Sequence, residues 1–423
     1  MFSTFKLKKQ IEEIKEGGHI VLLRKLENIL FVNFLFFIPA IPIVLIVRLV
    51  RPWYLIRFQS LISSRIGHFA ANTELYLFER DAGINVPSQR YVDVFYFGFK
   101  PICNEQLAKM WKDILMIMPR WLISPIDKVN QLIPGGKIHQ IGNNTQHDRD
   151  VHNLRERFPP YLRFTEEEEE LGSSKLHAMG IAPGSRFVCL SVRDSAYHVG
   201  HSWAYHDYRN STINNYRLAA ESLADQDYYV LRVGKKVLEP FETSSPKIID
   251  YANGTFKSDF MDIFIASKCE FFISNGEGLV CIPKLFRRPI CCVNLMPIGY
   301  SYSYINNLIT ISKHYTSKSD KKELSLSEIF TRGIGFSLFT SEYQSEGIEL
   351  LENTPEEILD VVTEMVERIN STWQSQEEDE DLQKKFWEIF PTEAVDERGI
   401  PLHGKIRGRY GAHFLRNNKT WLQ

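Results

Sequence analysis

Hydrophobic and polar positions alternate in two different ways along this chain. Between Ile29 and Val47 almost every position is apolar, whereas from Leu55 onward short apolar runs alternate with helical stretches. Such alternation is typical of α/β proteins with parallel sheets. The pattern predicts an amphipathic and apolar attachment segment over residues 1–54 and two Rossmann-like domains over residues 55–165 and 166–345. Carboxyl-terminal helices with a tail that packs back on the domains are expected over residues 346–423.

The apolar block Ile29–Val47 follows a mixed-charge, amphipathic stretch over residues 1–28. A helix of about 19 residues reaches about 28 Å, just enough to cross a bilayer core. Pro39 and Pro42 would kink it, and basic residues on both sides give no preferred orientation. We expect attachment to a membrane surface. A hairpin inserted from one face, a true span and a helix buried in the protein all remain open.

The second domain has the clearest pattern. Buried-type apolar runs that end at polar residues or glycine alternate with amphipathic stretches, which predicts a doubly wound parallel sheet with right-handed crossovers. The expected strands are Phe187–Val192, Tyr228–Val233, Lys247–Tyr251, Glu270–Ser274 and Ile290–Asn294, and the expected helices are Asn214–Gln226, Phe260–Ser267, Leu279–Phe286 and Thr354–Ile369.

The first domain is predicted from fewer elements. Helices are expected at Ala70–Glu79 and Asn104–Met118, and strands at Tyr91–Gly98 and Lys137–Ile141. The acidic run Glu377–Asp381 near the carboxyl terminus predicts a solvated linker.

Ligands of open parallel sheets bind beyond the carboxyl ends of the strands. The strand Phe187–Val192 is followed by Arg193 and Asp194, and an arginine at this edge can bind a phosphate with two parallel hydrogen bonds. The strand Tyr228–Val233 contributes Arg232 and is closed by Gly234, where a base or ribose could approach the backbone. An Arg–Asp pair that only fixes a loop, and a glycine that only makes a turn, are the alternatives.

The segment Asn275-Gly276-Glu277-Gly278 carries the most information about the ligand. Two glycines between a buried strand and a helix leave free N–H groups that can bind a pyrophosphate, and Glu277 could accept ribose hydroxyls. A glycine-rich turn with a capping glutamate is the alternative. Ser258 and Asp259 begin another helix at the same edge and form a weaker candidate.

In the first domain, the turn before the helix Ala70–Glu79 holds His68. A histidine titrates near neutral pH and could deprotonate a sugar hydroxyl, so His68 is the candidate general base and Glu74 its rival. A structural role for this lone histidine remains the alternative.

Composition and motifs exclude several classes of protein. The chain has 50 basic and 52 acidic residues, so it lacks the basic excess of a general nucleic-acid binder. It has neither a P-loop nor a dinucleotide-binding glycine motif. Its cysteines have no zinc-site spacing, and Asp148-Arg149-Asp150 matches a metal-binding D-x-D in letters only. We therefore expect no metal and no cofactor.

Several stretches, in this order, resemble a two-domain GT-B glycosyltransferase, and more narrowly a family of bacterial glycosyltransferases tied to surface-polysaccharide clusters. The resemblance covers about residues 55–423. Its motifs are R-I-G-H-F-A-A-N-T-E-L-Y-L (Arg65–Leu77), V-R-D-S-A-Y (Val192–Tyr197), D-Y-R-N-S (Asp207–Ser211), L-R-V-G (Leu231–Gly234), K-S-D-F-M-D (Lys257–Asp262), S-N-G-E-G (Ser274–Gly278) and F-L-R-N-N-K-T-W-L (Phe414–Leu422).

The resemblance implies transfer of a sugar from a nucleotide-activated donor, bound in the second domain, to a glycan or lipid-linked acceptor held by the first across a cleft. It also implies a diphosphate bound without a metal by Arg193, the Asn275–Gly278 turn and Arg232, and a loop containing Arg209 and Asn210 that orders over the sugar. We expect the cytoplasmic face of a bacterial inner membrane as the location. A nucleotide-sugar epimerase and a non-catalytic membrane-associated scaffold are the competing functions.

Overall fold

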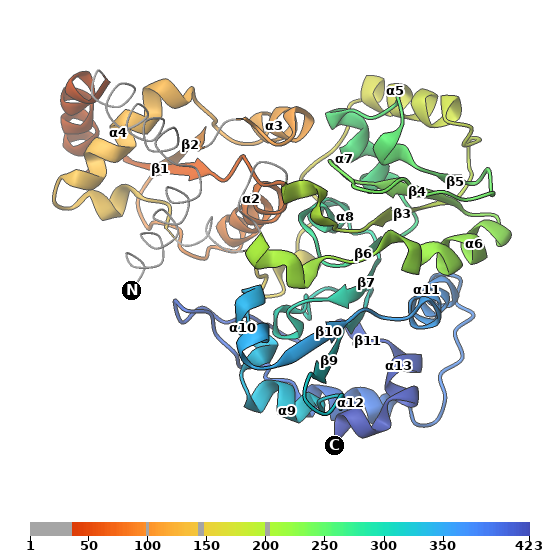
Figure 1. The fold of residues 1–423 in the computed structure, drawn as a ribbon. Helices are drawn as coiled ribbons and strands as arrows, with labels where there is room; N and C mark the ends of the chain where they lie inside the picture. Colours follow the sequence, from red (N-terminus) through yellow and green to blue (C-terminus); the bar gives the residue numbers. More distant parts are fainter. Residues whose placement is uncertain (1–35, 99–100, 143–147, 199–203) are drawn as a thin grey trace, which may run out of the picture. The chain divides into compact units, whose positions relative to one another are not determined.

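The computed structural model describes residues 36–98, 101–142, 148–198 and 204–423, and the chain forms two compact units (Figure 1). Unit 1 contains the described residues up to Arg65 together with Glu79–Cys103 and those of Ala108–His147. Unit 2 contains Ile66–Phe78, Asn104–Leu107 and Asp148–Gln423. Residues 148–165, which the sequence pattern assigned to the first domain, therefore group with unit 2.

Unit 1 is built around two parallel strands, β1 (Leu55–Leu61) and β2 (Tyr91–Phe97), with Leu55 opposite Tyr91. A helix over residues 36–50 and α4 (Arg120–Leu132) pack on them through one apolar cluster. The expected strand at Lys137–Ile141 is a 3-10 turn followed by a single bridge from Phe58 to Gln140. The described part of unit 1 thus holds a smaller sheet than the predicted doubly wound domain.

The helix over residues 36–50 lies within the predicted membrane-attachment segment, most of which falls outside the described residues. Among the described residues, no helix has the length and apolar character needed to cross a bilayer.

Unit 2 confirms the expected α/β fold with a large parallel sheet. Seven strands, all parallel, lie in the order β11-β8-β7-β6-β3-β4-β5. Their bounds are β3 Phe187–Ser191, β4 Tyr229–Val233, β5 Ile248–Ile249, β6 Phe272–Ser274, β7 Ile290–Leu295, β8 Leu308–Ser312 and β11 Arg409–Tyr410. The order reverses between β3 and β6, where an open parallel sheet places its ligand.

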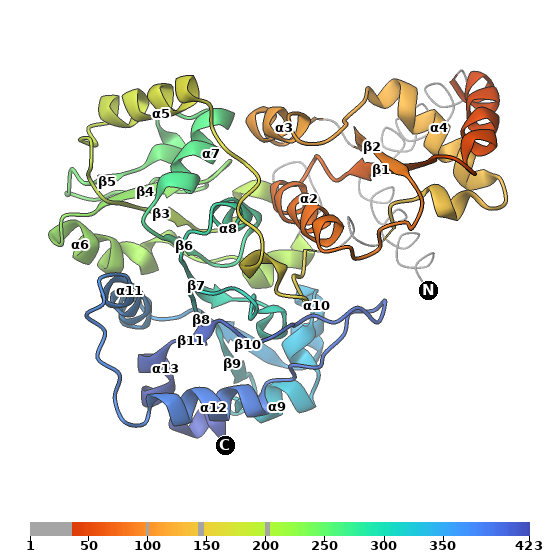
Figure 2. The same ribbon diagram turned by 180° about the vertical axis from the view of Figure 1, so that it is seen from behind.

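Helices cover both faces of this sheet (Figure 2). On one face α6 packs on α11, and on the other α7 packs on α8 and α5. Their bounds are α5 Glu166–Ala178, α6 Arg217–Asp225, α7 Asp259–Lys268, α8 Cys281–Leu285 and α11 Pro355–Ile369. The first thirteen residues of α2 (Ile66–Asp81), up to Phe78, also belong to unit 2, although this helix directly follows a strand of unit 1. The short helix α3 (Glu105–Lys112) is divided between the two units.

The acidic run predicted as a solvated linker instead begins α12 (Asp379–Ile389). Asp379 is 1% exposed and forms an ion pair with Arg416 of α13 (Ala412–Asn417). The neighbouring acidic residues Glu378 and Glu380 pair with Lys419 and Arg409. The prediction failed because the basic partners lie about 30 to 40 residues later in the sequence, where no local pattern reveals them.

A second, two-stranded antiparallel sheet joins β9 (His314–Ser317) and β10 (Ile348–Leu351), with α9 (Leu326–Thr331) and α10 (Thr340–Ser345) between them. The His314 ring on β9 is held by the carboxylates of Glu323 at 2.5 Å and Glu357 at 3.0 Å. Burial opposes the charged imidazolium, but these two hydrogen bonds outweigh it and raise the pKa of His314 to about 10. His314 is therefore a paired cation inside the fold.

Candidate functional site

Three chain segments meet at the carboxyl ends of β3 and β6, and Asn275 joins them. This residue is 1% exposed, and its Oδ1 accepts a hydrogen bond from the Arg193 amide at 3.0 Å. Its Nδ2 donates to the carbonyl of Arg209 at 3.0 Å. The sheet edge and the asparagine together bring two arginines, which are 16 residues apart in sequence, to one place.

The two arginines at this edge keep unused hydrogen-bond donors. Arg193 donates from Nε to Asn210 Oδ1 at 3.2 Å, and Arg209 donates from Nη2 to the carbonyl of Gly276. The Arg193 Nη2 and Arg209 Nε atoms are buried and have no partner among the described residues. Burial, and next the charge of Arg209, hold the pKa of Arg193 below its usual range. Unpaired buried donors are costly, so an anion placed here would be stabilised.

The turn after β6 presents its backbone and one carboxyl group to the same place. Gly276 has a φ of +80°, and a Cβ there would lie 2.9 Å from Leu295 Cδ1, so the turn requires glycine. Glu277 accepts a hydrogen bond from the Leu279 amide at 2.5 Å, whereas its buried Oε1 has no partner in the described structure. Burial raises the pKa of Glu277 in spite of the Leu279 amide and the nearby arginines.

The amino terminus of α2 packs directly against this turn. A Cβ on Gly67 would lie 3.2 Å from the Gly278 Cα, so the two backbones touch. The first N–H groups of a helix have no partner within the helix and attract negative charge, and the first turn of this 16-residue helix has no acidic residue. His68 follows Gly67, is half-buried, and has Nδ1 3.3 Å from Asn72 Oδ1. The candidate base is thus one residue from the contact with the turn.

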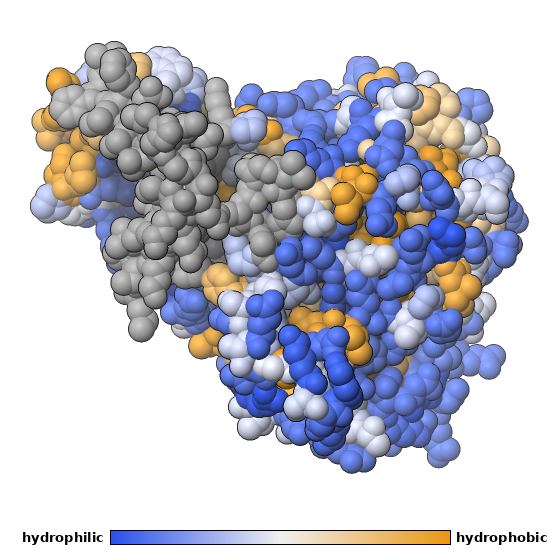
Figure 3. Space-filling view, viewed as in Figure 1, coloured by the Kyte–Doolittle hydropathy of each residue, from blue (hydrophilic) through white to orange (hydrophobic). Residues whose placement is uncertain are grey.

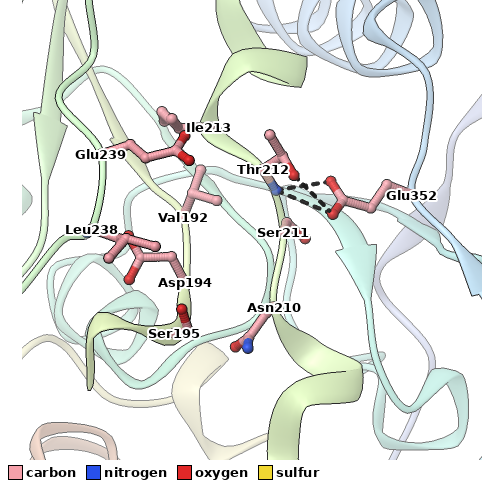
Figure 4. Close-up of a pocket in the computed structure, with 10 residues that line it drawn as sticks. All are labelled: Val192, Asp194, Ser195, Asn210, Ser211, Thr212, Ile213, Leu238, Glu239 and Glu352. Atoms are coloured by element: carbon pink, nitrogen blue, oxygen red, sulfur yellow. Dashed lines mark hydrogen bonds between the residues drawn. The ribbon is translucent and has the colours of Figure 1, made fainter. Parts of the chain in front are cut away.

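A cavity of about 200 Å³ opens beside the arginines and shares Asn210 with them (Figure 4). Its wall is partly apolar and partly made of hydroxyl, amide and carboxylate groups. The lining residues are Val192, Asp194, Ser195, Asn210, Ser211, Thr212, Ile213, Leu238, Glu239 and Glu352. A wall of this composition suits a small, polar organic group rather than a second phosphate.

Two side chains at this edge were not predicted. Lys313 directly follows β8, is 5% exposed and donates to the carbonyl of Asn210; burial lowers its pKa. Glu352 follows β10 and accepts the Thr212 amide at 2.9 Å, which fixes the loop at the cavity mouth. Both were missed because β8 and β10 were not expected. The alternation Leu308-Ile309-Thr310-Ile311 is the signal that could have indicated the strand before Lys313.

Asp194, Arg232 and Gly234 serve the loops around the site. Asp194 accepts hydrogen bonds from the amides of Ala196 at 2.9 Å and Leu238 at 2.6 Å. Arg232 is fully buried within β4 and is paired with Asp250 at 3.0 Å. Gly234 has a φ of +155°, which a turn accommodates with glycine. Asp194 thus fixes its loop, and Arg232 is paired with a carboxylate of the protein, although its buried Nε has no partner among the described residues.

Ser258, Asp259 and Glu74 are not brought to the arginines by any contact in the described structure. Ser258 caps α7 by accepting the Met261 amide at 3.2 Å, and Asp259 accepts the Glu105 amide and Lys235 Nζ. Glu74 is 1% exposed between Arg155 at 2.7 Å and Arg287 at 2.9 Å. Its carboxylate is neutralised there, which favours His68 as the candidate base.

Asp150, from the D-x-D letters, caps a turn by accepting the amides of Leu154 and Arg155 at 2.8 and 2.9 Å. The described residues contain no group of three His, Cys, Asp or Glu side chains arranged to hold a metal ion.

The loop residue Tyr208 is 5% exposed and packs on Tyr343, with ring centroids 5.3 Å apart. This contact between two tyrosine rings anchors the Asp207–Asn210 loop to the rest of unit 2.

No family model and no curated protein sequence matches this chain. Among solved structures, it is similar to the ADP-heptose LPS heptosyltransferase II of E. coli, with 10% identity, a TM-score of 0.42, and coverage of 74% of this chain and 100% of that one. It is also similar to a family 9 glycosyl transferase of Veillonella parvula, with 11% identity, a TM-score of 0.43, and coverage of 74% and 97%. Similarity this distant assigns neither the role of any residue nor a substrate to this chain.

Proposed function

We propose that this protein is a glycosyltransferase that takes a sugar from a nucleoside diphosphate donor and transfers it to a hydroxyl of a glycan or lipid-linked acceptor. The observation that carries the proposal is the pair of buried, unpartnered donors, Arg193 Nη2 and Arg209 Nε, at the carboxyl edge of the parallel sheet. Two guanidinium groups that repel each other attract an anion with several acceptor oxygens, and a diphosphate is such an anion.

The diphosphate would lie between the two arginines, the Gly276–Gly278 turn and the amino terminus of α2. The cavity lined by Asn210, Thr212 and Leu238 would take the nucleoside, with hydroxyl and amide groups as hydrogen-bond partners. Asp194 and Glu352 already accept backbone amides, so they would set the shape of this cavity rather than bind the ligand.

His68 would act as the general base. With Nδ1 protonated and donating to Asn72 Oδ1 at 3.3 Å, the lone pair on Nε2 is free to accept a proton. The acceptor oxygen forms a bond to the anomeric carbon, the bond from that carbon to the diphosphate breaks, and the acceptor proton moves to His68. The charge that develops on the departing diphosphate is stabilised by Arg193, Arg209 and the helix end, without a metal in this proposal.

A nucleotide panel tests the binding step. Free UDP, GDP, ADP, CDP and CMP are added to the full chain, and its melting temperature is measured. One nucleoside diphosphate is expected to raise it, and Arg193→Ala to abolish the rise. Arg332→Ala, which removes an exposed arginine paired with Glu346, is the matched control and should keep it. No response to any nucleotide would contradict the proposal.

Turnover then separates the competing functions. Release of the nucleoside diphosphate only in the presence of an acceptor supports transfer, whereas conversion of the donor alone would indicate an epimerase. Full glycan output in cells that carry Arg193→Ala would indicate a non-catalytic scaffold.

A further inference from the structure

The helix over residues 36–50 is apolar on its inner and outer faces. Ala40, Val44 and Val47 are buried in the cluster of unit 1, against α4 and the two strands. The opposite face is also apolar but exposed, with Ile38, Leu45, Ile46 and Leu49 at 67, 58, 60 and 71%. A helix that is hydrophobic all around is usually buried in protein or in lipid, and the described residues cover only one face.

Exposed apolar side chains also lie outside this helix. Trp53 is 71% exposed, Trp121 at the start of α4 is 61% exposed, and Leu132 at its end is 76% exposed. The Phe36 and Trp121 rings lie 6.2 Å apart, so the two helices present neighbouring apolar groups. Figure 3 shows hydrophobic surface where Figure 1 places these two helices. Tryptophan is enriched where a protein meets the headgroup region of a bilayer.

The exposed charged side chains within the two chain stretches that carry this surface have one sign. In residues 36–54 and 116–138 the exposed charged side chains are Arg51, Arg120 and Lys137, and all are basic. Asp127 is the one acidic residue in these two stretches; it is 3% exposed and accepts a hydrogen bond from Tyr96 at 2.8 Å. Cations beside an apolar face attract anionic lipid headgroups.

We propose that this surface, defined by Ile38, Leu45, Ile46, Leu49, Trp53 and Trp121, binds an anionic phospholipid bilayer, with the helix lying in the plane of the interface. One face of this helix packs on unit 1 through Ala40, Val44 and Val47, so its opposite face can meet the bilayer while the helix lies along the interface. A second copy of the chain fits this face less well, because it would bring the same basic residues against each other. The proposal is independent of the proposed reaction.

Vesicle flotation of the full chain tests this surface. Binding is expected on vesicles of phosphatidylcholine mixed with phosphatidylglycerol and to be weaker on phosphatidylcholine alone. The double variant Leu45→Glu with Leu49→Glu should lose binding about tenfold or more, since it places two charges where apolar groups met the lipid. Leu171→Glu on α5, where the leucine is 47% exposed, is the matched control and should bind as the unchanged protein does.

The basic residues should affect vesicle binding differently from the apolar residues. Replacing Arg51 and Arg120 by Gln should lower binding to the anionic vesicles about fivefold per residue and leave binding to phosphatidylcholine unchanged. Quenching of tryptophan fluorescence by brominated lipid should decrease in Trp53→Phe and Trp121→Phe.

Three results would overturn the proposal. These are failure of the full chain to bind either vesicle, vesicle binding that survives the double leucine change, or a stable dimer that the double change dissociates. The nucleotide-induced rise in melting temperature is measured on the same variants. Loss of vesicle binding with that rise intact distinguishes this surface from the proposed catalytic site.

Discussion

Unit 2 contains two pairs of partly buried arginines that differ in the groups they contact. Arg155 and Arg287 bind one carboxylate, Glu74, at 2.7 and 2.9 Å. Arg193 and Arg209 bind backbone carbonyl and amide oxygens and form no ion pair within the described structure, and each keeps a buried donor without a partner. The first pair is neutralised by a carboxylate of the protein, although Arg155 Nε is also a buried donor without a partner among the described residues. Under the proposed function, the diphosphate neutralises the second pair. A carboxylate partner, more than burial, therefore distinguishes the first pair from the second.

Removing Glu74 should have the largest effect on stability. Glu74→Ala leaves two buried guanidinium groups without a counter-charge, and loss of one partner of a buried pair costs about 3–5 kcal/mol. Chemical denaturation should show this loss, while Glu346→Gln at an exposed pair should change little. If nucleotide affinity of the folded protein fell with Glu74→Ala, the distinction between the two arginine pairs would be wrong.

His314 extends the comparison to a third paired cation. Its pKa in the folded protein is raised to about 10 from an ordinary 6.5, so its contribution to stability is complete below about pH 6.5 and is lost as pH rises through about 10. His314→Gln should destabilise the protein by about 2–4 kcal/mol at neutral pH. The difference from the unchanged protein should shrink as pH approaches 10. His413→Gln, at a histidine 39% exposed, is the control, and its effect on stability at neutral pH should be small.

Removing Arg193 or Arg209 should weaken nucleotide binding without lowering the stability of the fold. Arg193→Ala or Arg209→Ala deletes charge-assisted hydrogen bonds worth about 1.5–3 kcal/mol, a loss of about 10- to 150-fold in nucleotide affinity. Titration calorimetry measures the affinity, and the melting temperature of the free protein should not fall, because mutual repulsion of the two arginines is relieved. A large fall would assign this pair a structural role.

Among these variants, Arg193→Lys should have the smallest effect, a modest loss of nucleotide affinity. Arg193→Lys keeps the positive charge but loses the planar fork that binds two oxygens, so affinity should fall about fivefold. Equal affinities of the lysine and alanine variants would mean that charge contributes nothing at this position.

Sequence pattern predicted the central strands of unit 2 within about two residues of their observed ends. β3, β4, β6 and β7 are buried apolar runs bounded by polar residues, glycine or proline, which is a local signal. β11 has only two residues, Arg409 and Tyr410, and exists because it pairs with β8 about a hundred residues earlier. A contact at that distance leaves no local periodicity.

The candidate site was predicted only in part, because some of its contacts join residues that lie far apart in the sequence. The rule that ligands bind at the carboxyl edge of the sheet placed Arg193 and the Asn275–Gly278 turn together, and their contact through Asn275 follows from it. Arg232 and Glu74 could not be judged from sequence, because the side chains that neutralise them are remote or lie on other elements. Lys313 was missed together with the strand that positions it.

The touching backbones of Gly67 and Gly278 have a consequence for chimaeras made from this chain and a second protein of the same fold. The chain passes between the two units after residues 65, 78, 103, 107 and 147, and the segment with Gly67 belongs to the unit that holds the arginines. A chimaera joined at one boundary in the middle of the sequence would pair Gly67 from one parent with Gly278 from another. Exchange of the proposed donor site would therefore have to carry residues 66–78 and 104–107 together with 148–423.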